Sequence, residues 1–211
     1  MRVIAGSAGG IQLHVPKAGI RPTMDRVKAA IFSSLADKVV GARVLDLFAG
    51  TGALGIEALS RGAASVLFVD EDGRAIDTIE RNLKKAKVEG QTRQREVFDF
   101  LNRQCGSHRQ FSLSNSLGKF DLIFADPPYE QTKSGEKFTD KLLANESLPQ
   151  LLAPNGIFVL EKRPSETVPE THLWHLIRRK AYGATEVLFL AHNPQSAMNA
   201  SPARTNPQSG E

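Results

Sequence analysis

Short apolar runs recur along the chain and alternate with amphipathic stretches. Residues 44–48 and 120–125 are almost wholly apolar, as expected of strands that a parallel sheet buries on both faces. Residues 65–69 and 157–161 have the same character. Between them, residues 73–88 place apolar side chains on one helical face, namely Ile76, Ile79, Leu83 and Ala86. The alternation predicts an α/β fold built on a mostly parallel sheet.

Weaker patterns complete the expected elements. Residues 2–5 and 11–15 are typical of a hairpin, and a helix beginning at Thr23 carries Arg26 and Lys28 on its outer face. The remaining expected elements are a helix over 53–61 ending at Gly62, a strand over 94–98, a helix over 98–104, a helix over 138–152, and an antiparallel pair over 173–178 and 186–191.

Three segments of different composition divide the chain. Residues 1–42 are expected to form an N-terminal hairpin and helix, and residues 43–191 the main α/β domain. Residues 192–211 are rich in Asn, Pro, Ser and Ala, so we expect a disordered tail. Residues 105–117 are polar and serine-rich, which is typical of a surface loop.

Composition narrows the class of protein. No apolar run approaches the ~20 residues of a membrane span, and the first residues lack the apolar stretch of a secretory signal. The single cysteine, Cys105, excludes an internal disulfide and suits a reducing cytoplasm. The five histidines do not cluster with cysteines or acids at metal-ligand spacing, so we expect no metal.

Positive charge is concentrated near the N-terminus. The formal net charge is +4, whereas residues 1–43 hold seven Lys or Arg against two Asp or Glu, a local excess of +5. A basic arm on a nearly neutral remainder points to a polyanionic partner such as a nucleic acid. A solvated surface accounts for the same charge equally well, so charge alone does not decide.

A glycine-rich turn follows the first buried strand. Residues 50–55 match the G-x-G-x-x-G pattern of dinucleotide sites. Asp70, which ends the next strand, is placed to accept both hydroxyls of a ribose. Asp46 lies inside the first strand, where a pyrophosphate needs no carboxylate but the ammonium and sulfonium of S-adenosylmethionine gain from one. Glu96 is a candidate to bind the adenine amine.

A second turn, Asp126-Pro127-Pro128-Tyr129, follows the buried strand over 120–125. A primary amine on a purine or pyrimidine ring is a poor nucleophile, because its lone pair is delocalised into the ring. Asp126 offers a carboxylate acceptor for the N–H bonds, and Pro127 offers its carbonyl in a rigid turn. Tyr129 offers a face on which an extruded base can stack. The turn therefore predicts methylation of a ring amine without a metal.

Together these motifs resemble the bacterial small-subunit ribosomal RNA guanine-N2 methyltransferases of the RsmD type, which belong to the seven-stranded S-adenosylmethionine-dependent methyltransferases. The resemblance covers residues 1 to about 191 and includes the glycine turn, Asp70, the Asp-Pro-Pro-Tyr turn and the closing Tyr182-Gly183. Arg21-Pro22-Thr23 with Asp25-Arg26-Val27 narrows the choice to this family. The resemblance implies a Rossmann-like seven-stranded sheet whose last strand is antiparallel. A small N-terminal extension that helps to bind RNA precedes this sheet.

The resemblance implies three groups of site residues. The methionine part of the cofactor is surrounded by Asp46, Gly50 and Gly52, with Asp70 on the ribose and Glu96 near the adenine. Neighbouring residues assigned to the same site are Phe48, Ala49, Thr51, Glu71 and Asp126. The guanine amino group is received by Asp126, Pro127, Pro128 and Tyr129. The residues expected to contact RNA are Arg21, Thr23 and Arg26.

The implied partner is ribosomal RNA within an assembled or partly assembled small subunit, and we expect a cytoplasmic monomer.

Two features depart from the family. The hairpin turn at residues 7–11 lacks the basic residues that members usually carry, which predicts weaker phosphate contacts. The loop over 105–117 is longer than usual.

Three other functions fit parts of the sequence. An amino-methyltransferase for adenine N6 in DNA or RNA, or for a protein glutamine, would share both turns, although Asp126 in place of asparagine argues against glutamine. The 211 residues leave little room for a DNA-recognition domain. A nicotinamide-dependent oxidoreductase would leave Asp46 and Asp126 unexplained. A non-catalytic RNA-binding protein would have no need to retain Asp46, Asp70 and Asp126.

Overall fold

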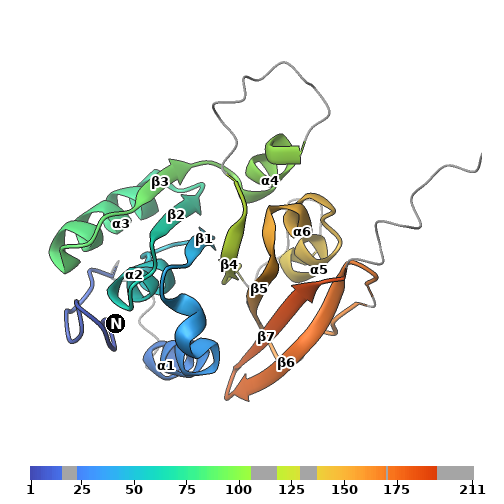
Figure 1. Ribbon diagram of the computed structural model, residues 1–211, viewed down its shortest axis with the longest axis horizontal. Coiled ribbons are helices and arrows are strands. Elements are labelled where there is room, and N and C mark those ends of the chain that lie inside the picture. Colours follow the sequence, from blue (N-terminus) through green and yellow to red (C-terminus); the bar gives the residue numbers. More distant parts are fainter. Residues whose placement is uncertain (16–22, 106–117, 129–136, 170, 194–211) are drawn as a thin grey trace, which may run out of the picture.

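The computed structural model describes residues 1–15, 23–105, 118–128, 137–169 and 171–193 (Figure 1). The helices are α1 (Thr23–Leu35), the short 3-10 helix η1 (Ala36–Val39), α2 (Ala53–Ser60), α3 (Gly73–Ala86), α4 (Val97–Cys105), α5 (Phe138–Leu143) and α6 (Ser147–Leu151). The strands are β1 (Arg43–Leu47), β2 (Ser65–Asp70), β3 (Gln91–Gln94), β4 (Phe120–Ala125), β5 (Leu152–Lys162), β6 (Trp174–Tyr182) and β7 (Thr185–His192). The expectations for the tail beyond residue 193 and for the loop over 106–117 concern residues outside these ranges.

The strands form one seven-stranded sheet in the order β3-β2-β1-β4-β5-β7-β6. Strands β1 to β5 pair with one another in parallel, whereas β7 is antiparallel to both β5 and β6. This arrangement confirms the predicted α/β fold and its antiparallel last strand. None of the described helices is long and apolar enough to cross a membrane.

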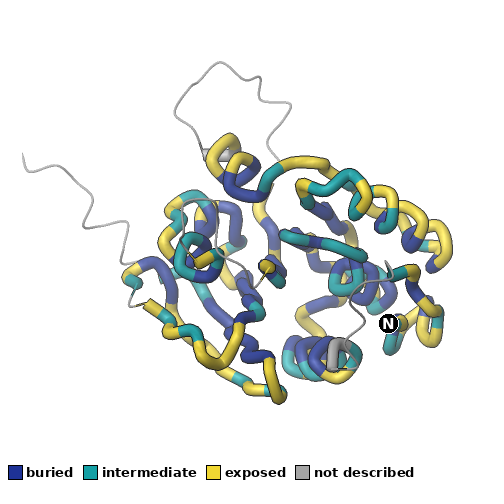
Figure 2. The backbone as a smooth tube through the Cα atoms, turned by 180° about the vertical axis from the view of Figure 1, so that it is seen from behind, coloured by how far each residue is buried: buried dark blue, intermediate teal, exposed yellow. Residues whose placement is uncertain are grey.

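Helices cover both faces of the sheet, and each face has its own apolar core. Side chains of α1, α2 and α3 pack on one face with Val44, Phe68 and Phe124, while α4, α5 and α6 pack on the other with Leu45 and Leu160. Buried residues follow the central strands, whereas the edge strand β6 is mostly exposed (Figure 2). The double burial explains why these strands read as continuous apolar runs.

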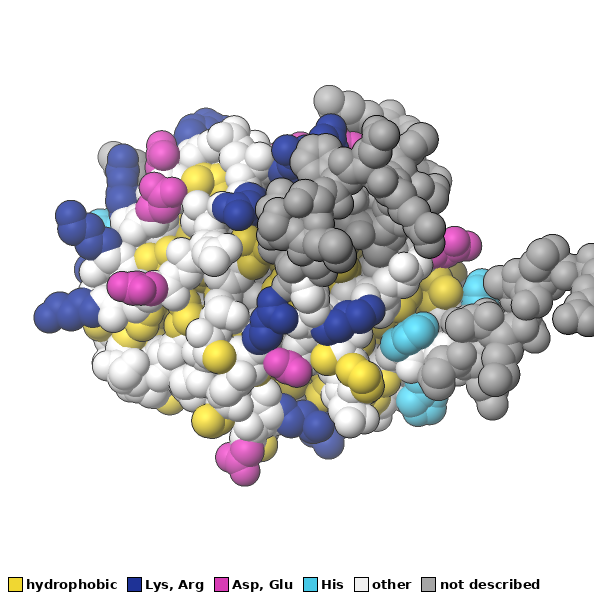
Figure 3. All heavy atoms as spheres, turned by 45° about the horizontal axis from the view of Figure 1, so that its top comes forward, with side chains coloured by type: hydrophobic (Ala, Val, Ile, Leu, Met, Phe, Trp, Pro, Cys, Tyr) yellow, Lys and Arg dark blue, Asp and Glu magenta, His cyan; other side chains and the backbone are white. Residues whose placement is uncertain are grey.

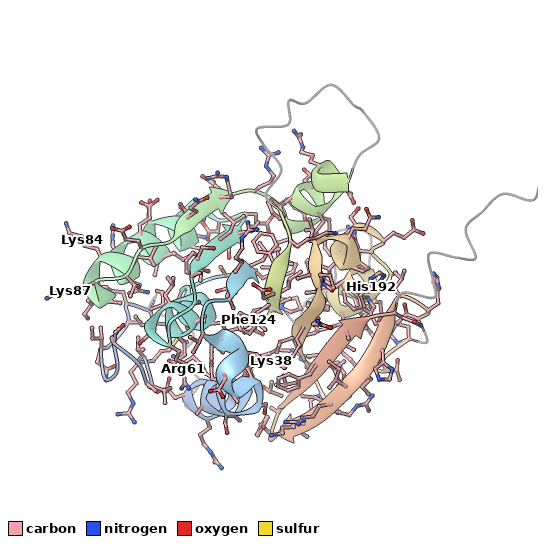
Figure 4. The ribbon with its side chains drawn as sticks, viewed as in Figure 1. Lys38, Arg61, Lys84, Lys87, Phe124 and His192 are labelled. Carbon is pink, nitrogen blue, oxygen red and sulfur yellow. The ribbon has the colours of Figure 1, made fainter. Side chains whose placement is uncertain are left out.

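Aromatic and cationic side chains fix α1 against the sheet and against α2. Phe124 lies near the centre of the sheet, and its ring centroid is 5.7 Å from that of Phe32 in α1 (Figure 4). Arg61, at the end of α2, places its guanidinium 4.9 Å from the centroid of the same Phe32 ring. These contacts hold α1 beside the carboxyl ends of the central strands, where the site lies.

The third strand was wrongly placed by the sequence, which predicted it over 94–98. The strand is β3, Gln91–Gln94, paired with β2 from Leu67 to Asp70. Glu96 accepts a hydrogen bond from the N–H of Asp99 at 2.7 Å and so begins α4 at Val97. Val97 and Phe98 resembled a strand because they are apolar, but they are buried as residues of a helix.

The predicted helix over 138–152 is divided into α5 and α6. The Oδ1 atom of Asn145 accepts hydrogen bonds from the N–H groups of Ser147 and Leu148 at 3.0 and 2.9 Å. This local cap ends one helix and starts the next. Leu152 then already belongs to β5, so residues 154–156 lie within a strand that shifts register rather than after a helix.

Candidate active site

A tight loop joins β1 to α2 and is closed by backbone hydrogen bonds. The N–H of Gly52 donates to the carbonyl of Ala49 at 2.7 Å. Gly52 has φ = 75°, a left-handed backbone that favours glycine, and a Cβ there would crowd the Ile79 side chain at 3.2 Å. Phe48 has φ = 55°, a left-handed backbone that is uncommon for an aromatic residue and concentrates at ligand sites.

Asp46 lies inside β1 and is only 2% exposed. Its Oδ2 accepts a hydrogen bond from the N–H of Gly55 in α2 at 2.9 Å. Burial, followed by the charges of Asp126 and Asp70, raises the pKa of Asp46 to about 8. A positively charged ligand beside this carboxylate would offset those effects by favouring the ionised form.

Asp70 closes the glycine loop from the end of β2. Its Oδ2 accepts a hydrogen bond from the N–H of Gly50 at 2.8 Å, and its Oδ1 accepts one from the backbone N–H of Asp72 at 2.9 Å. Asp72 in turn caps α3 by accepting from the N–H of Arg74 at 2.9 Å. The carboxylate therefore orders the turn, a role that the sequence did not predict for it.

The other two predicted cofactor acids lie nearer the β3 edge. Glu96 caps α4, as described above, and is partly exposed. Glu71 is exposed, and its carbonyl accepts a hydrogen bond from the side chain of Gln94 at 3.4 Å. Among the described residues, neither acid lines the pocket beside the glycine loop.

A pocket of ≈ 250 Å³ opens beside the glycine loop and is called the glycine-loop pocket below. Its lining includes residues that the sequence predicted for the cofactor, namely Asp46, Phe48, Ala49, Gly50, Thr51 and Asp126. Further lining residues are Met1, Lys28, Ala53, Leu54 and Glu161. Three carboxylates thus face one pocket, which gives it the polarity that a cationic ligand requires.

A second pocket of ≈ 230 Å³, the proline-turn pocket, lies against Pro127 and Pro128. Its other walls come from the start of α5 and from the end of β5 with the turn that follows, namely Lys137, Phe138, Thr139, Glu161, Lys162, Arg163, Ser165 and Glu166. Glu161 therefore lines both pockets. Tyr129, predicted to stack on a base, lies outside the described residues.

Lys28 contradicts the prediction that it lies on the outer face of α1. The residue is 3% exposed, and its Nζ lies 3.3 Å from Oε2 of the buried Glu57. Burial lowers the pKa of Lys28, and the neighbouring Glu57 opposes that effect. Lys28 precedes Ile31 and Leu35 at helical spacing, so the buried stripe of α1 could have been extended to include it.

The N-terminal segment is bonded to the glycine-loop side of the sheet. Glu57 accepts hydrogen bonds from the N–H groups of Ile4 and Ala5 at 2.7 and 3.1 Å. The two predicted strands pair through one bridge, between Arg2 and Gln12, and backbone N–H groups of Val3, Gly10 and Leu13 donate hydrogen bonds across the turn.

Asn82 of α3 joins the same segment to the loop. Its Nδ2 donates to the carbonyls of His14 and Thr51 at 3.0 and 2.9 Å, and its Oδ1 accepts from the N–H of His14 at 2.6 Å. Of the predicted RNA contacts, Arg26 is exposed on α1, Thr23 is the first residue of α1, and Arg21 lies outside the described residues.

Glu161 is the acidic residue of the site that the sequence prediction missed. It stands at the end of the fifth buried strand, as Asp70 and Asp126 stand at or just after the ends of β2 and β4. Burial, then the charges of Asp126 and Asp46, raises the pKa of Glu161. Within the described parts of the chain, no group of three or more His, Cys, Asp or Glu residues is arranged to hold a metal ion.

Comparisons with known proteins identify the family of the chain. The family model described as conserved hypothetical protein 95 matches residues 1–191. YlbH of Bacillus subtilis is 38% identical over 190 residues, covering 89% of this chain and 96% of YlbH. Ribosomal RNA small subunit methyltransferase D of Escherichia coli is 33% identical over 202 residues, covering 95% and 94%. The solved structure of yhhF from Escherichia coli has a TM-score of 0.70 and 31% identity, covering 91% and 97%.

Proposed function

Because the chain belongs to the conserved hypothetical protein 95 family, we propose that it methylates the exocyclic N2 amine of a guanine in small-subunit ribosomal RNA, with S-adenosylmethionine as donor. One observation carries the proposal. The glycine-loop pocket and the Asp-Pro-Pro turn share Asp126, so a cofactor in the pocket and an amine at the turn would meet at one carboxylate. A ribosomal substrate would place the protein in the cytoplasm.

The residues of the glycine-loop pocket suit a cationic nucleoside cofactor. Asp46 is a buried carboxylate whose pKa is raised by burial and by the charges of Asp126 and Asp70, so a cation beside it would be stabilised. Glycines at 50 and 52 leave room for close approach of a ligand to the backbone. When bound, S-adenosylmethionine supplies an electrophilic methyl group on a sulfonium, which carries its own leaving group.

The Asp-Pro-Pro turn suits an aromatic amine. In this proposal, the Asp126 carboxylate and the Pro127 carbonyl accept the two N–H bonds of the amine and direct its lone pair toward the methyl group. The N–C bond forms as the C–S bond breaks, and the proton released from the nitrogen passes to Asp126. Orientation of the amine is the main contribution of the protein to this reaction.

Basic side chains near the turn suit an RNA backbone. Lys137 and Arg163 border the proline-turn pocket and are exposed. On the face shown in Figure 3, Lys and Arg side chains are spread across the surface with acidic side chains among them. Phosphates could therefore be held at several separate points rather than along one basic stripe.

The test is methyl transfer from radiolabelled S-adenosylmethionine to small ribosomal subunits that lack the modification, to free ribosomal RNA and to duplex DNA. We expect label in the ribosomal RNA of the first substrate, and loss of that label with Asp126→Asn. The matched control is Asp77→Asn, because Asp77 is exposed on α3. Label in DNA alone, or equal label with Asp126→Asn, would overturn the proposal.

A further inference from the structure

Glu161 occupies a place in the sheet that sets it beside Asp126. In the parallel pairing of β4 with β5, Ala125 is opposite Leu160, so the next residues along the two chains are Asp126 and Glu161. Both therefore lie at the carboxyl ends of neighbouring central strands. Ligands of open α/β sheets bind at such ends.

The alternation of β5 sets the face on which Glu161 lies. Ile157 and Val159 belong to the core beneath α1, α2 and α3, whereas Phe158 and Leu160 belong to the opposite core. Glu161 is two residues after Val159, so it lies on the same face of the sheet as Val159. In β1, Asp46 likewise lies on the face of Val44. Three acids from adjacent strands, Asp46, Asp126 and Glu161, thus share one face of the sheet.

The two pockets meet at Glu161. The glycine-loop pocket and the proline-turn pocket lie on either side of the Asp126-Pro127-Pro128 turn, and Glu161 lines both of them. Asp46, in contrast, is among the lining residues of the glycine-loop pocket and not of the proline-turn pocket. A group at the junction can reach the part of the substrate base that adjoins the reacting amine.

Guanine presents two kinds of donor on the edge that carries the amine. The N2 amine lies next to N1–H, and both donate hydrogen bonds. Adenine has no hydrogen on N1, which accepts a hydrogen bond instead. An ionised carboxylate has acceptors only, so it pairs with N1–H of guanine and repels N1 of adenine. The raised pKa of Glu161 favours its protonated form in the empty site, and a donor such as N1–H shifts it back toward the ionised form. A site built on such a pair discriminates strongly, because the wrong base leaves a buried polar group unpaired.

We propose that Glu161 selects guanine by accepting a hydrogen bond from its N1–H while Asp126 and the Pro127 carbonyl hold the N2 amine. This inference rests on the proposed function, since it concerns the base that enters the same site. The two neighbouring acids then have different roles. Asp126 orients the N2 amine, which is the nucleophile, and Glu161 binds N1–H, the adjoining position of the ring. Asp46 remains with the cofactor.

The test uses Glu161→Gln and a base analogue that inverts the hydrogen-bond pattern. In 2,6-diaminopurine the N2 amine is retained, but N1 is an acceptor. The side-chain amide of glutamine can donate to that N1, whereas the wild-type carboxylate cannot. The methylated position is first mapped by nuclease digestion and mass spectrometry of the labelled RNA. Small subunits are then reconstituted with guanine or 2,6-diaminopurine at that position, and kcat/KM is measured for each.

We expect wild-type protein to favour guanine over 2,6-diaminopurine by about 10- to 100-fold. Glu161→Gln should reverse or abolish that preference, while its Kd for S-adenosylmethionine, measured by calorimetry, stays within about twofold of wild type. Glu161→Asp retains the carboxylate and should retain the guanine preference at a lower rate. Glu146→Gln, at an exposed residue between α5 and α6, is the control for loss of a carboxylate.

Two results would overturn the inference while leaving the proposed function intact. Unchanged guanine preference in Glu161→Gln would show that the residue does not read the base. A loss of cofactor affinity that accounts for the whole loss of activity would assign Glu161 to the cofactor instead. Failure of wild-type protein to methylate guanine-containing subunits would contradict the proposed function itself, together with this inference.

Discussion

The ammonium group of Lys28 lies 3.3 Å from the carboxylate of Glu57, and both side chains are buried. The pair joins α1 to α2 at the wall of the glycine-loop pocket, which Lys28 lines. Glu57 also binds Arg61 at 2.8 Å and the backbone of Ile4 and Ala5. One acid therefore connects the N-terminal segment, α1 and α2.

Replacing Glu57 should cost more stability than any surface substitution. Glu57→Ala leaves the Lys28 ammonium buried without its charge partner and two backbone N–H groups without acceptors, so we expect a loss of about 3–5 kcal/mol in the free energy of unfolding. Urea denaturation of the variant measures this loss. Glu89→Ala, at an exposed residue, is the control, and equal stability of the two variants would contradict the role given to the pair.

The raised pKa of Asp46 predicts a pH dependence for the ligand-free protein. Unfolded, this carboxyl titrates at about 3.9, whereas in the fold its pKa is about 8. Its contribution to stability is therefore fully present below about pH 4 and is lost as the pH rises through about 8. Melting temperatures of wild type and Asp46→Asn, measured between these values, should diverge, with only the wild type losing this stability. Parallel curves would contradict the assignment.

Cofactor affinity should change with pH in the opposite direction. A sulfonium or ammonium favours ionised Asp46, so S-adenosylmethionine should bind more tightly as the pH rises toward 8, with release of a proton. Asp46→Asn should bind weakly at every pH. Calorimetry in buffers of different ionisation enthalpy measures the proton release, and binding of equal strength by wild type and variant would exclude Asp46 from the cofactor site.

Asn82 lies in α3 but should affect the glycine loop, because its side chain donates a hydrogen bond to the carbonyl of Thr51. Asn82→Asp keeps the acceptor for His14 N–H but loses the donors to the carbonyls of His14 and Thr51. We expect a loss of about 1–3 kcal/mol in the free energy of unfolding. We also expect weaker binding of S-adenosylmethionine, because the glycine loop loses its hydrogen bond to α3. Asp77→Asn, an exposed exchange on the same helix, should change neither quantity.

Arg26 is predicted to contact RNA. Its exposed side chain on α1 should neutralise about one phosphate, so Arg26→Ala should lower the salt dependence of RNA binding by about one unit of slope. Filter binding across a range of salt concentrations measures the slope. Arg81→Ala, on the exposed side of α3, serves for comparison, and an unchanged slope in Arg26→Ala would remove this residue from the RNA surface.

The sheet could be predicted because its strands carry their own signal. Residues buried on both faces must be apolar, so the runs now seen as β1, β2 and β4 were evident, and Asp46 was conspicuous within one of them. β3 is short and polar, and its side chains are exposed or only partly buried. It therefore lacks an apolar run of its own, and the apolar residues at the start of α4 resembled the strand instead.

The periodicity of apolar residues does not predict contacts between side chains that are distant in the sequence. Lys28 was assigned to the surface because lysine is rarely buried, and its partner Glu57 is distant in the sequence. The structure also gives Asp70 bonds to the glycine turn that no local pattern implies. Glu161 was overlooked because an acid at a strand end has meaning only once the neighbouring strand, with Asp126, is known.

The identity of the methylated nucleoside distinguishes the proposed function from its alternatives. Small subunits lacking the modification are incubated with S-adenosylmethionine and either wild-type protein or Asp126→Asn, and their RNA is digested and analysed by mass spectrometry. We expect N2-methylguanosine with the wild type and its loss with the variant. Methyl groups on adenine N6 or on protein, or N2-methylguanosine formed equally by Asp126→Asn, would contradict the proposed function.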